Sequence, residues 1–244
     1  MNKKTPQKIQ EIIFGIHPVI ELLTAKKRQL HAIYTTKPVP KSWSMIERLL
    51  PKNVQVNYVP RDALARMAQT VDHQGVVAYA GLLPIRKKFF DATKHPFLLM
   101  IDGVQDTRNL GAILRSAYCA GVDGVILVKK NSAPLNASTY KAAAGLSEHV
   151  DIYEAPSAIF AAQELKKAGY GLYLATLGGE NAVAMPYQKP LCIVIGNEAT
   201  GISSEILSLG QQVMLPQRRK DISYNASVAA GILLFLIGSH IKKI

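Results

Sequence analysis

The chain has 244 residues, 48% of them hydrophobic, which is enough apolar material for the core of one large or two small domains. Its net charge of +12 is concentrated in residues 1–97, where 16 Lys and Arg stand against 6 Asp and Glu. That excess favours a polyanionic partner, although a solubilising surface explains it equally well.

The first part of the chain, up to residue 83, alternates short apolar runs with helical patterns. The apolar runs are residues 12–14, 32–35, 54–59 and 76–80. This alternation predicts a small α/β domain over residues 1–83. Residues 84–96 are charged and bounded by prolines, which interrupt helices, so we expect them to link two domains.

The second part, residues 97–244, contains continuous apolar runs separated by helical stretches. The runs are residues 97–101, 125–128, 172–175, 191–195 and 213–215, and the helical stretches lie near residues 110–120, 139–146, 158–168 and 204–209. This pattern predicts a parallel sheet covered on both faces. Residues 226–241 read as a final helix that is apolar nearly all round, and an oligomer interface is one way to bury it.

Polar or glycine-rich segments follow several of the predicted strands, at residues 102–109, 176–179, 196–201 and 216–225. In open parallel sheets ligands bind outside the carboxyl ends of the strands, so these segments can converge on one site. The chain has no GxGxxG after a strand, no P-loop and no serine nucleophile elbow. An ordinary dinucleotide fold is therefore unsupported.

Cys119 and Cys192 are the only cysteines. They form neither a disulfide framework nor a metal-ligand spacing, and they suit a reducing cytoplasm. The apolar run 226–237 is too short to span a bilayer. We expect a cytoplasmic protein without a membrane or a metal partner.

Asn109 and Arg115 are two polar residues of the helix predicted after residue 101. A structural role is a sufficient reason for the first of them but not for the second. Asn109 is a good N-cap type, which by itself would account for it. Arg115 stands nearly two turns later among small and apolar residues, where a structural role would favour another aliphatic side chain. A functional role is therefore favoured for Arg115, because its planar fork suits phosphate or ribose oxygens.

Two later segments combine polar side chains with turn or cap residues. Glu198 lies between Gly196 and Gly201, and these glycines permit a close approach of backbone to a ligand. A turn followed by a carboxylate that favours the next helix dipole explains this segment equally well. Ser223 and Asn225 open the last helix, where N-capping is a sufficient account.

Taken together, three segments resemble the three motifs of the SpoU/TrmH (SPOUT) family of RNA ribose 2′-O-methyltransferases. They are NLGAILR at 109–115, IGNEATG at 195–201, and LP followed by SYNASVA within 215–229. Upstream, IFGIHPVIELL at 13–23 and HQGVVAYAG at 73–81 resemble the N-terminal RNA-binding domain of the RlmB-like subgroup, which is similar to small ribosomal proteins.

The resemblance implies a knotted methyltransferase domain over residues 97–244, with a deep trefoil knot that binds S-adenosylmethionine, and a homodimer that acts on RNA. It implies a catalytic set of Asn109, Arg115, Glu198, Ser223 and Asn225. It also implies that the methyl donor is lined by Thr176, Leu177, Gly178, Gly196, Asn197, Gly201, Leu215, Pro216 and Tyr224.

The substrate implied by the resemblance is a guanosine ribose of large-subunit (23S) ribosomal RNA. A tRNA 2′-O-methyltransferase and a non-catalytic RNA-binding or ribosome-assembly protein are the alternatives, and a nucleotide-cofactor oxidoreductase is a weaker one. The chain departs from the family at Gln217, Arg219 and Tyr224, where Met, Gly and Leu are usual, and at Thr107, where proline is common.

The mechanism implied is an in-line attack of the ribose 2′-hydroxyl on the sulfonium methyl group. A guanidinium has a pKa of about 12.5 or higher, which argues against Arg115 as a free base. We expect Arg115 to orient the hydroxyl together with a neighbouring RNA phosphate and to stabilise the developing alkoxide.

Overall fold

The computed structural model describes residues 10–219 and 223–244, which form two compact units. The first unit contains the described residues up to Pro84 together with Leu135–His149, and the second contains Ile85–Pro134 and Val150–Ile244. The chain therefore passes from one unit to the other three times.

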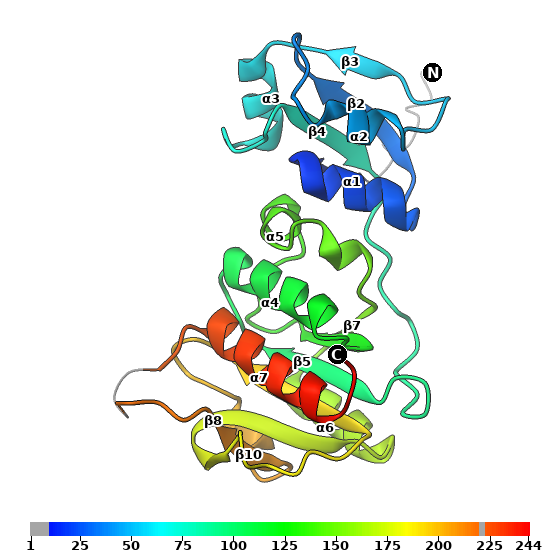
Figure 1. Cartoon of the computed structure of the whole chain (residues 1–244). Helices are drawn as coiled ribbons and strands as arrows, with labels where there is room; N and C mark the ends of the chain where they lie inside the picture. The colour runs from blue at the N-terminus through cyan, green and yellow to red at the C-terminus, as the bar shows by residue number, and fades with distance from the viewer. Residues whose placement is uncertain (1–9, 220–222) are drawn as a thin grey trace, which may run out of the picture. The chain divides into compact units, whose positions relative to one another are not determined.

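The first unit is built on a four-stranded mixed sheet in the order β1-β4-β2-β3 (Figure 1). Its strands are β1 (Glu11–Phe14), β2 (Leu30–Thr35), β3 (Val56–Tyr58) and β4 (Val76–Ala80). Strand β4 runs antiparallel to β1 and β2, and β2 and β3 are parallel. The predicted small α/β domain is thus confirmed in kind.

Three helices connect these strands, namely α1 (Ile16–Ala25), α2 (Trp43–Glu47) and α3 (Arg61–Ala68). Helix α1 buries Val19 and Leu22, and α3 buries Leu64 against Phe14 and Val77 of the sheet. Burial of these apolar side chains removes them from water, and this stabilises the packing of the helices against the sheet.

A segment distant in sequence also belongs to the first unit. It comprises helix α5 (Ala137–Ala142) and the short 3-10 helix η1 (Leu146–Glu148), whereas the sequence pattern predicts a single helix near residues 139–146. The predicted boundaries assign this segment to the 97–244 domain, but it packs with β1 and α1. Gly145, with φ of +84°, makes the turn between α5 and η1.

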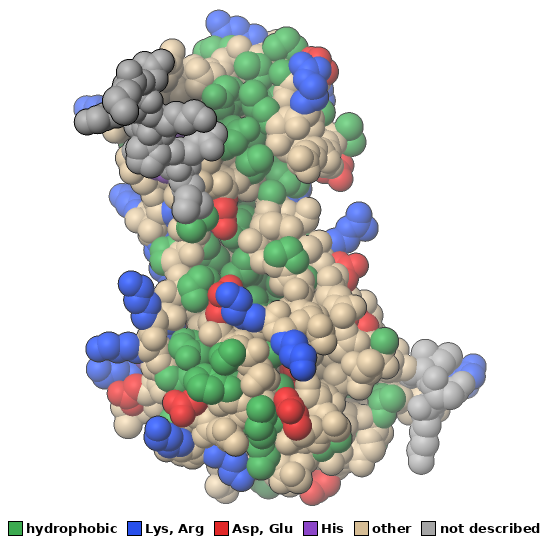
Figure 2. Space-filling model, turned by 180° about the vertical axis from the view of Figure 1, so that it is seen from behind, with side chains coloured by type: hydrophobic (Ala, Val, Ile, Leu, Met, Phe, Trp, Pro, Cys, Tyr) green, Lys and Arg blue, Asp and Glu red, His purple; other side chains and the backbone are tan. Residues whose placement is uncertain are grey.

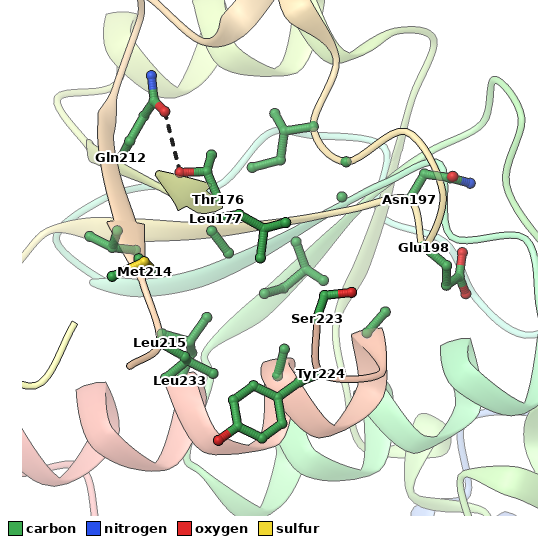
Figure 3. A pocket seen from close by; sticks show the side chains of 18 of the residues that line it. Thr176, Leu177, Asn197, Glu198, Gln212, Met214, Leu215, Ser223, Tyr224 and Leu233 are labelled. Atoms are coloured by element: carbon green, nitrogen blue, oxygen red, sulfur yellow. Dashed lines mark hydrogen bonds between the residues drawn. The ribbon is translucent and has the colours of Figure 1, made fainter. Parts of the chain in front are cut away.

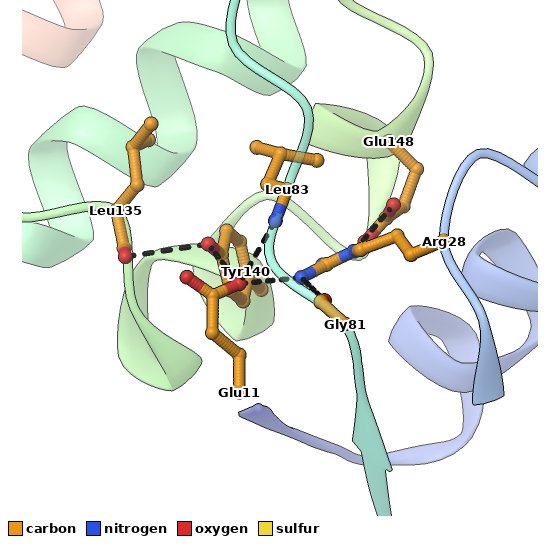
Figure 4. Close-up of polar contacts among 7 residues, drawn as sticks. All are labelled: Glu11, Arg28, Gly81, Leu83, Leu135, Tyr140 and Glu148. Atoms are coloured by element: carbon orange, nitrogen blue, oxygen red, sulfur yellow. Dashed lines mark hydrogen bonds and ion pairs between the residues drawn. The ribbon is translucent and has the colours of Figure 1, made fainter. Parts of the chain in front are cut away.

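Buried polar contacts hold that segment on the first unit (Figure 4). The Arg28 guanidinium pairs with the Glu148 carboxylate, and its Nη1 also lies 2.5 Å from Oε2 of Glu11. The Tyr140 hydroxyl donates to Glu11 Oε2 at 2.8 Å, and its ring lies 4.7 Å from Arg28 Cζ. Burial raises the pKa of the Tyr140 hydroxyl, and the neighbouring Glu11 carboxylate raises it further.

The second unit is built on a six-stranded parallel sheet in the order β10-β8-β9-β5-β6-β7. The strands are β5 (Phe97–Asp102), β6 (Gly124–Val128), β7 (Ile152–Ala155), β8 (Gly171–Asn181), β9 (Leu191–Gly196) and β10 (Gln211–Met214). All five strand pairs are parallel, which confirms the predicted parallel sheet. Strand β7, at the edge, is not among the predicted strands.

Helices cover both faces of this sheet. Helix α6 (Ala158–Lys167) packs on one face, where alternate strand residues such as Leu98 and Met100 are buried. Helices α4 (Thr107–Cys119) and α7 (Ala226–His240) pack against each other on the opposite side (Figure 1). Figure 2, seen from behind, shows acidic and basic side chains interspersed over the second unit, so this side has no single sign of charge.

The segment predicted as the linker is held against the second unit. Arg86 donates its backbone N–H to the Ile152 carbonyl at 2.8 Å and its Nη1 to Asp151 at 2.8 Å. The Phe90 ring is buried over Gly124, where a Cβ would lie 2.1 Å from the ring. Residues 85–96 therefore cover the β6–β7 edge instead of hanging between the units.

Asn109 does not cap helix α4, so the structural explanation that its residue type offered does not apply. Helix α4 begins at Thr107, and the Asp106 carboxylate caps it by accepting from the N–H groups of Arg108 and Asn109. Asn225 does cap α7, because its Oδ1 accepts from the N–H groups of Ser227 and Val228. No helix among the described residues is long and apolar enough to cross a membrane.

Candidate active site

A cavity of about 500 Å³ opens beside the middle of strand β8 and the carboxyl ends of β9 and β10 (Figure 3). It is lined by residues 175–177, 195–202 and 212–215, by Ser223 and Tyr224, and by the first turns of α7. The ends of parallel strands are where open α/β sheets bind ligands, and three of the four polar segments noted in the sequence contribute here. Among its described lining residues, Glu198 alone carries a charged side chain.

The loop after β9 folds back on itself at one end of the cavity. Asn197 and Gly201 exchange backbone hydrogen bonds at 2.9 and 3.0 Å, and the Asn197 side chain accepts from Ala199 and Thr200. Gly196 allows this fold, because a Cβ there would lie 2.4 Å from the backbone atoms of Gly201 and Ile202. Tight backbone packing thus gives the loop a fixed shape where it lines the cavity.

The same loop is fastened to the neighbouring strand β5. Asn197 Nδ2 donates to the Gly103 carbonyl at 2.7 Å. The buried Asp102 carboxylate accepts from the N–H and hydroxyl of Ser203 at 2.8 and 3.1 Å. No role for Asp102 or Ser203 was predicted from the sequence. A carboxylate that directly follows a wholly apolar run, as Asp102 does, is nevertheless a pattern that indicates a buried hydrogen-bond acceptor.

Three of the predicted catalytic residues form one hydrogen-bonded chain. Asn109 Nδ2 donates to Glu198 Oε1 at 2.8 Å, and Asn225 Nδ2 donates to Asn109 Oδ1 at 3.2 Å. Each residue comes from a different motif, and the Asn225 oxygen is fixed by its role as the α7 cap. The second carboxylate oxygen of Glu198 has no hydrogen-bond partner among the described residues, and the residue as a whole is exposed.

Arg115 lies apart from this chain of side chains. It is exposed on α4, does not line the cavity, and forms no hydrogen bond or ion pair with the described residues. Tyr118 and Cys119, which follow it by about one helical turn, are exposed too. The structure therefore joins Asn109, Glu198 and Asn225 but leaves Arg115 on an open helix face.

The predicted cofactor-binding residues divide into two groups. Seven line the cavity: Thr176, Leu177, Gly196, Asn197, Gly201, Leu215 and Tyr224. Gly178 and Pro216 are exposed and do not line it. Ser223, from the catalytic set, also lines the cavity. Thr176 is oriented by a hydrogen bond from its hydroxyl to Gln212 at 3.2 Å (Figure 3).

Apolar residues complete the cavity, and sequence reasoning missed most of them. Leu215 and Leu233 lie at one end of it, opposite Asn197 and Glu198 (Figure 3). Val213, Met214 and Leu207 add further apolar surface. Their only signal in the sequence is position, in or next to a short strand or about two turns into the last helix, and that signal does not distinguish them from ordinary core residues.

The residues present fit S-adenosylmethionine in kind. The cavity volume is within the range of about 300 to 1,000 Å³ usual for small-molecule sites. Its apolar end suits an adenine ring, and the peptide groups of residues 196–201 suit the polar edges of a nucleoside. Among the described residues, no group of three or more His, Cys, Asp or Glu side chains could hold a metal ion.

Comparison with protein-family models assigns both parts of the chain. The model of the SpoU rRNA methylase family matches residues 96–235, and the model named RNA 2′-O ribose methyltransferase substrate binding matches residues 12–84. The chain belongs to the SpoU rRNA methylase family. The family resemblance noted in the motifs is therefore confirmed.

Relatives in the SpoU family match the chain over nearly its full length. The 23S rRNA (guanosine-2′-O-)-methyltransferase RlmB of Shewanella oneidensis is 32% identical, with 93% of this chain and 96% of that protein covered. The RlmB of Haemophilus influenzae is 29% identical, with 94% of this chain and 97% of that protein covered.

Solved structures of RNA methyltransferases share the fold. A crystal structure of an RNA 2′-O ribose methyltransferase has a TM-score of 0.84 at 20% identity and covers 96% of this chain and 90% of its own. An AdoMet-bound rRNA methyltransferase from Sinorhizobium meliloti has a TM-score of 0.78 at 22% identity, covering 95% and 88%. This fold implies the trefoil knot that the resemblance predicted.

Proposed function

We propose that the protein transfers a methyl group from S-adenosylmethionine to a guanosine ribose 2′-oxygen of 23S ribosomal RNA. One observation carries the proposal: the segments of motifs two and three line one cavity, and Asn109 of motif one is hydrogen-bonded to Glu198 at its edge. Support for the substrate comes from relatives of about 30% identity that are named 23S rRNA (guanosine-2′-O-)-methyltransferase. Such a substrate would be met in the cytoplasm.

In this proposal the cavity holds the methyl donor mainly through backbone groups. Backbone atoms of the 196–201 loop that are not used within the loop would bind its polar edges, and Leu215 and Leu233 would pack on its ring. Thr176 and Leu177 close a third side. When bound, the cofactor supplies an electrophilic methyl group on a positively charged sulfur, and a cavity with few charged side chains leaves that charge unpaired for reaction.

The residues of the chain act on the RNA ribose. Asn109 holds the Glu198 carboxylate at the cavity edge, where its free oxygen can accept from a ribose hydroxyl. Ser223, which lines the cavity beside Tyr224, can contact the same sugar. Arg115 binds the 2′-oxygen and the adjacent RNA phosphate and stabilises the alkoxide while the hydroxyl proton passes by way of that phosphate to solvent.

We further propose a homodimer that pairs the exposed side of α4 and α7. Phe235 is 61% exposed, and Val228 and Ile232 are exposed on the same helix. An apolar face of this kind is costly in water and marks an interaction surface. Arg115 and Tyr118 are exposed on the adjacent helix α4. In a dimer formed through these two helices, Arg115 of one subunit would act on the RNA bound at the cavity of the other subunit.

The first unit favours rRNA over tRNA as the substrate class. Structures with titles that name tRNA cover 62% of this chain, whereas the structures of rRNA methyltransferases cover 95% and 96%. The extra coverage includes the part matched by the substrate-binding model. A tRNA methyltransferase is therefore the second candidate.

The test begins with calorimetric titration of the protein with S-adenosylmethionine, because a non-catalytic RNA-binding protein predicts no heat of binding. Unmodified 23S rRNA and total tRNA are then incubated with the protein and radiolabelled cofactor. The proposal predicts label in 23S rRNA, at one guanosine located by mass spectrometry of nuclease fragments. Label in tRNA alone would favour the second candidate.

A further inference from the structure

The two N-terminal sequence motifs meet in the first unit beside a lysine from another part of the chain. Gly15 belongs to the segment 13–23, and Gln74 belongs to the segment 73–81. Gln74 Oε1 accepts from the Ile16 N–H at 3.0 Å, which joins the two. The Lys141 side chain, from helix α5, also lies next to Gly15. Lys141 belongs to the part of the chain matched by the methylase-family model, not to the part matched by the substrate-binding model.

Gly15 forms the floor beneath these side chains. Its φ of +97° lies in the region that favours glycine. A Cβ at this position would lie 2.5 Å from Lys141 Nζ and 2.9 Å from Gln74 Oε1. The ammonium and the amide oxygen therefore both lie where a side chain of residue 15 would be, and any side chain there would displace them.

The Lys141 ammonium has no acceptor in this arrangement. It forms no hydrogen bond or ion pair with the described residues, although the side chain is half-buried. Its contact with the Phe14 ring, at 5.9 Å, is at the outer limit of a cation–π interaction. Burial lowers the pKa of Lys141, and the exposed Asp72 only partly opposes this. A half-buried cation without an acceptor is costly unless an anion binds it.

The surroundings add donors and positive charge. With Oε1 occupied, Gln74 keeps both hydrogens of its Nε2 for another acceptor. Burial lowers the pKa of His73, and the positive charges of Arg61 and Lys141 lower it further, against the opposing effect of Asp72. Asp72 is the one carboxylate among the charges that act on Lys141 and His73 within the described part of the chain.

Helix α5 is fixed in the position that this contact needs. Tyr140, next to Lys141, is anchored through its hydroxyl to Glu11, and η1 is anchored through Glu148 to Arg28 (Figure 4). Asn136 caps the first turn by accepting from Ser138 and Thr139. A long flexible side chain is thus presented from a rigid base, which lowers the entropy lost when it binds a ligand.

We propose that Lys141 and Gln74, above the bare backbone of Gly15, bind a phosphate group of the RNA substrate. This inference rests on the proposed function, since it assigns residues to the recognition of that RNA. It means that RNA binding by the first unit depends on α5, which lies outside the substrate-binding match at residues 12–84.

The test compares Lys141→Gln with Lys52→Gln, an exposed lysine of the same unit without an interaction among the described residues. Both variants lose one charge, and binding of full-length protein to an unmodified 23S rRNA transcript is measured over a range of salt. Lys141→Gln should weaken binding about fivefold and lower the slope of log Kd against log salt by about 0.7 to 0.9, the value for one phosphate contact. Lys52→Gln should change neither quantity appreciably, and Lys141→Arg should restore most of the slope.

A second measurement uses the wild-type chain and does not depend on variant folding. Lysine amines are acylated with and without the 23S rRNA transcript, and the rate at each residue is read by mass spectrometry. The transcript should slow acylation of Lys141 much more than that of Lys52. Methylation kinetics give a third readout, in which Lys141→Gln raises the KM for RNA and leaves kcat and the Kd for S-adenosylmethionine unchanged.

The outcomes separate this inference from the proposed function. If the wild-type protein binds no RNA and methylates none, both fail. If the wild type binds and methylates RNA, but Lys141→Gln matches Lys52→Gln in affinity and slope and RNA gives Lys141 no protection, only the phosphate site is overturned.

Discussion

The side-chain amide of Asn109 donates to the Glu198 carboxylate at 2.8 Å, and so connects the first turn of α4 with the loop after β9. The same amide accepts from Asn225 at the start of α7. An amide can serve both neighbours because it has a donor and an acceptor at opposite ends.

Replacement of Asn109 by Asp should impair methyl transfer more than replacement by Ala. The new carboxylate would keep the acceptor for Asn225 but set a second negative charge against Glu198, which raises the pKa of the pair. We expect Asn109→Asp to lose about tenfold or more in kcat/KM at about pH 8, the effect of a charged hydrogen bond of about 1.5 to 3 kcal/mol, and to recover part of it near pH 6. A pH profile identical to that of Asn109→Ala would contradict this account.

Arg115 provides a test of where each active site is completed. Arg115→Ala should lose nearly all methyl transfer, about 1,000-fold, with the Kd for S-adenosylmethionine nearly unchanged. If Arg115 serves the cavity of the partner subunit, mixed dimers of Arg115→Ala and Glu198→Gln chains contain one intact site. Their activity should then exceed that of either variant alone, whereas action within one chain predicts no recovery.

Gly196→Ala should damage the cofactor site while Gly178→Ala should not. The added methyl group at Gly196 would lie 2.4 Å from backbone atoms of Gly201 and Ile202 and would force the loop outward. Overpacking of about 2 kcal/mol corresponds to an affinity loss of about 30-fold. A Cβ at Gly178 meets nothing within 4 Å, which makes it the matched control. Calorimetric titration with S-adenosylmethionine measures both, and equal affinities would refute the loop's role.

Phe235→Asp should convert the proposed homodimer into monomers. The substitution places a charge in the centre of the exposed apolar face of α7. Phe160, an exposed aromatic residue on α6, offers the control substitution Phe160→Asp. Sedimentation velocity at micromolar concentration measures the mass, and a wild-type protein that sediments as a monomer would exclude the dimer altogether.

Arg28→Met should destabilise the protein more than the double change of Arg28→Met with Glu148→Met. The single variant leaves the Glu148 carboxylate buried without its partner, which costs about 3 to 5 kcal/mol, whereas apolar replacement of both partners is often nearly neutral. Unfolding in urea, followed by circular dichroism, gives the free energies. Equal losses in the single and double variants would contradict this account.

The sheet of the second unit could be predicted because its central strands are buried on both faces. Leu98 and Leu99 are both fully buried, so the sequence there is continuously apolar and unlike any exposed segment. Strand β7 was missed for the opposite reason, since the half-exposed Tyr153 and Glu154 interrupt its apolar pattern at the edge of the sheet. Strand β5 could thus be predicted from the sequence because both of its faces are buried, whereas β7 could not, because it is partly exposed.

Only the polar residues of the site could be predicted from the sequence. Asn109, Glu198 and Asn225 stand out because polar residues follow buried strands or open helices, and the structure joins them. Leu233 and Met214 do not stand out, because an apolar residue in a cavity wall has the same sequence signature as one in the core. The attachment of residues 135–149 to the first unit was hidden too, since its anchors Glu11 and Arg28 lie more than 100 residues away.

That attachment has a consequence for how the protein is made. Glu148 is 120 residues beyond its partner Arg28, so the first unit lacks a structural element until part of the second has been synthesised. At about 5 to 20 residues per second, translation leaves Arg28 without its carboxylate for roughly 6 to 24 s. The N-terminal unit must therefore finish folding after part of the enzyme that follows it has emerged, and a gene fragment ending near residue 84 would encode an incomplete unit.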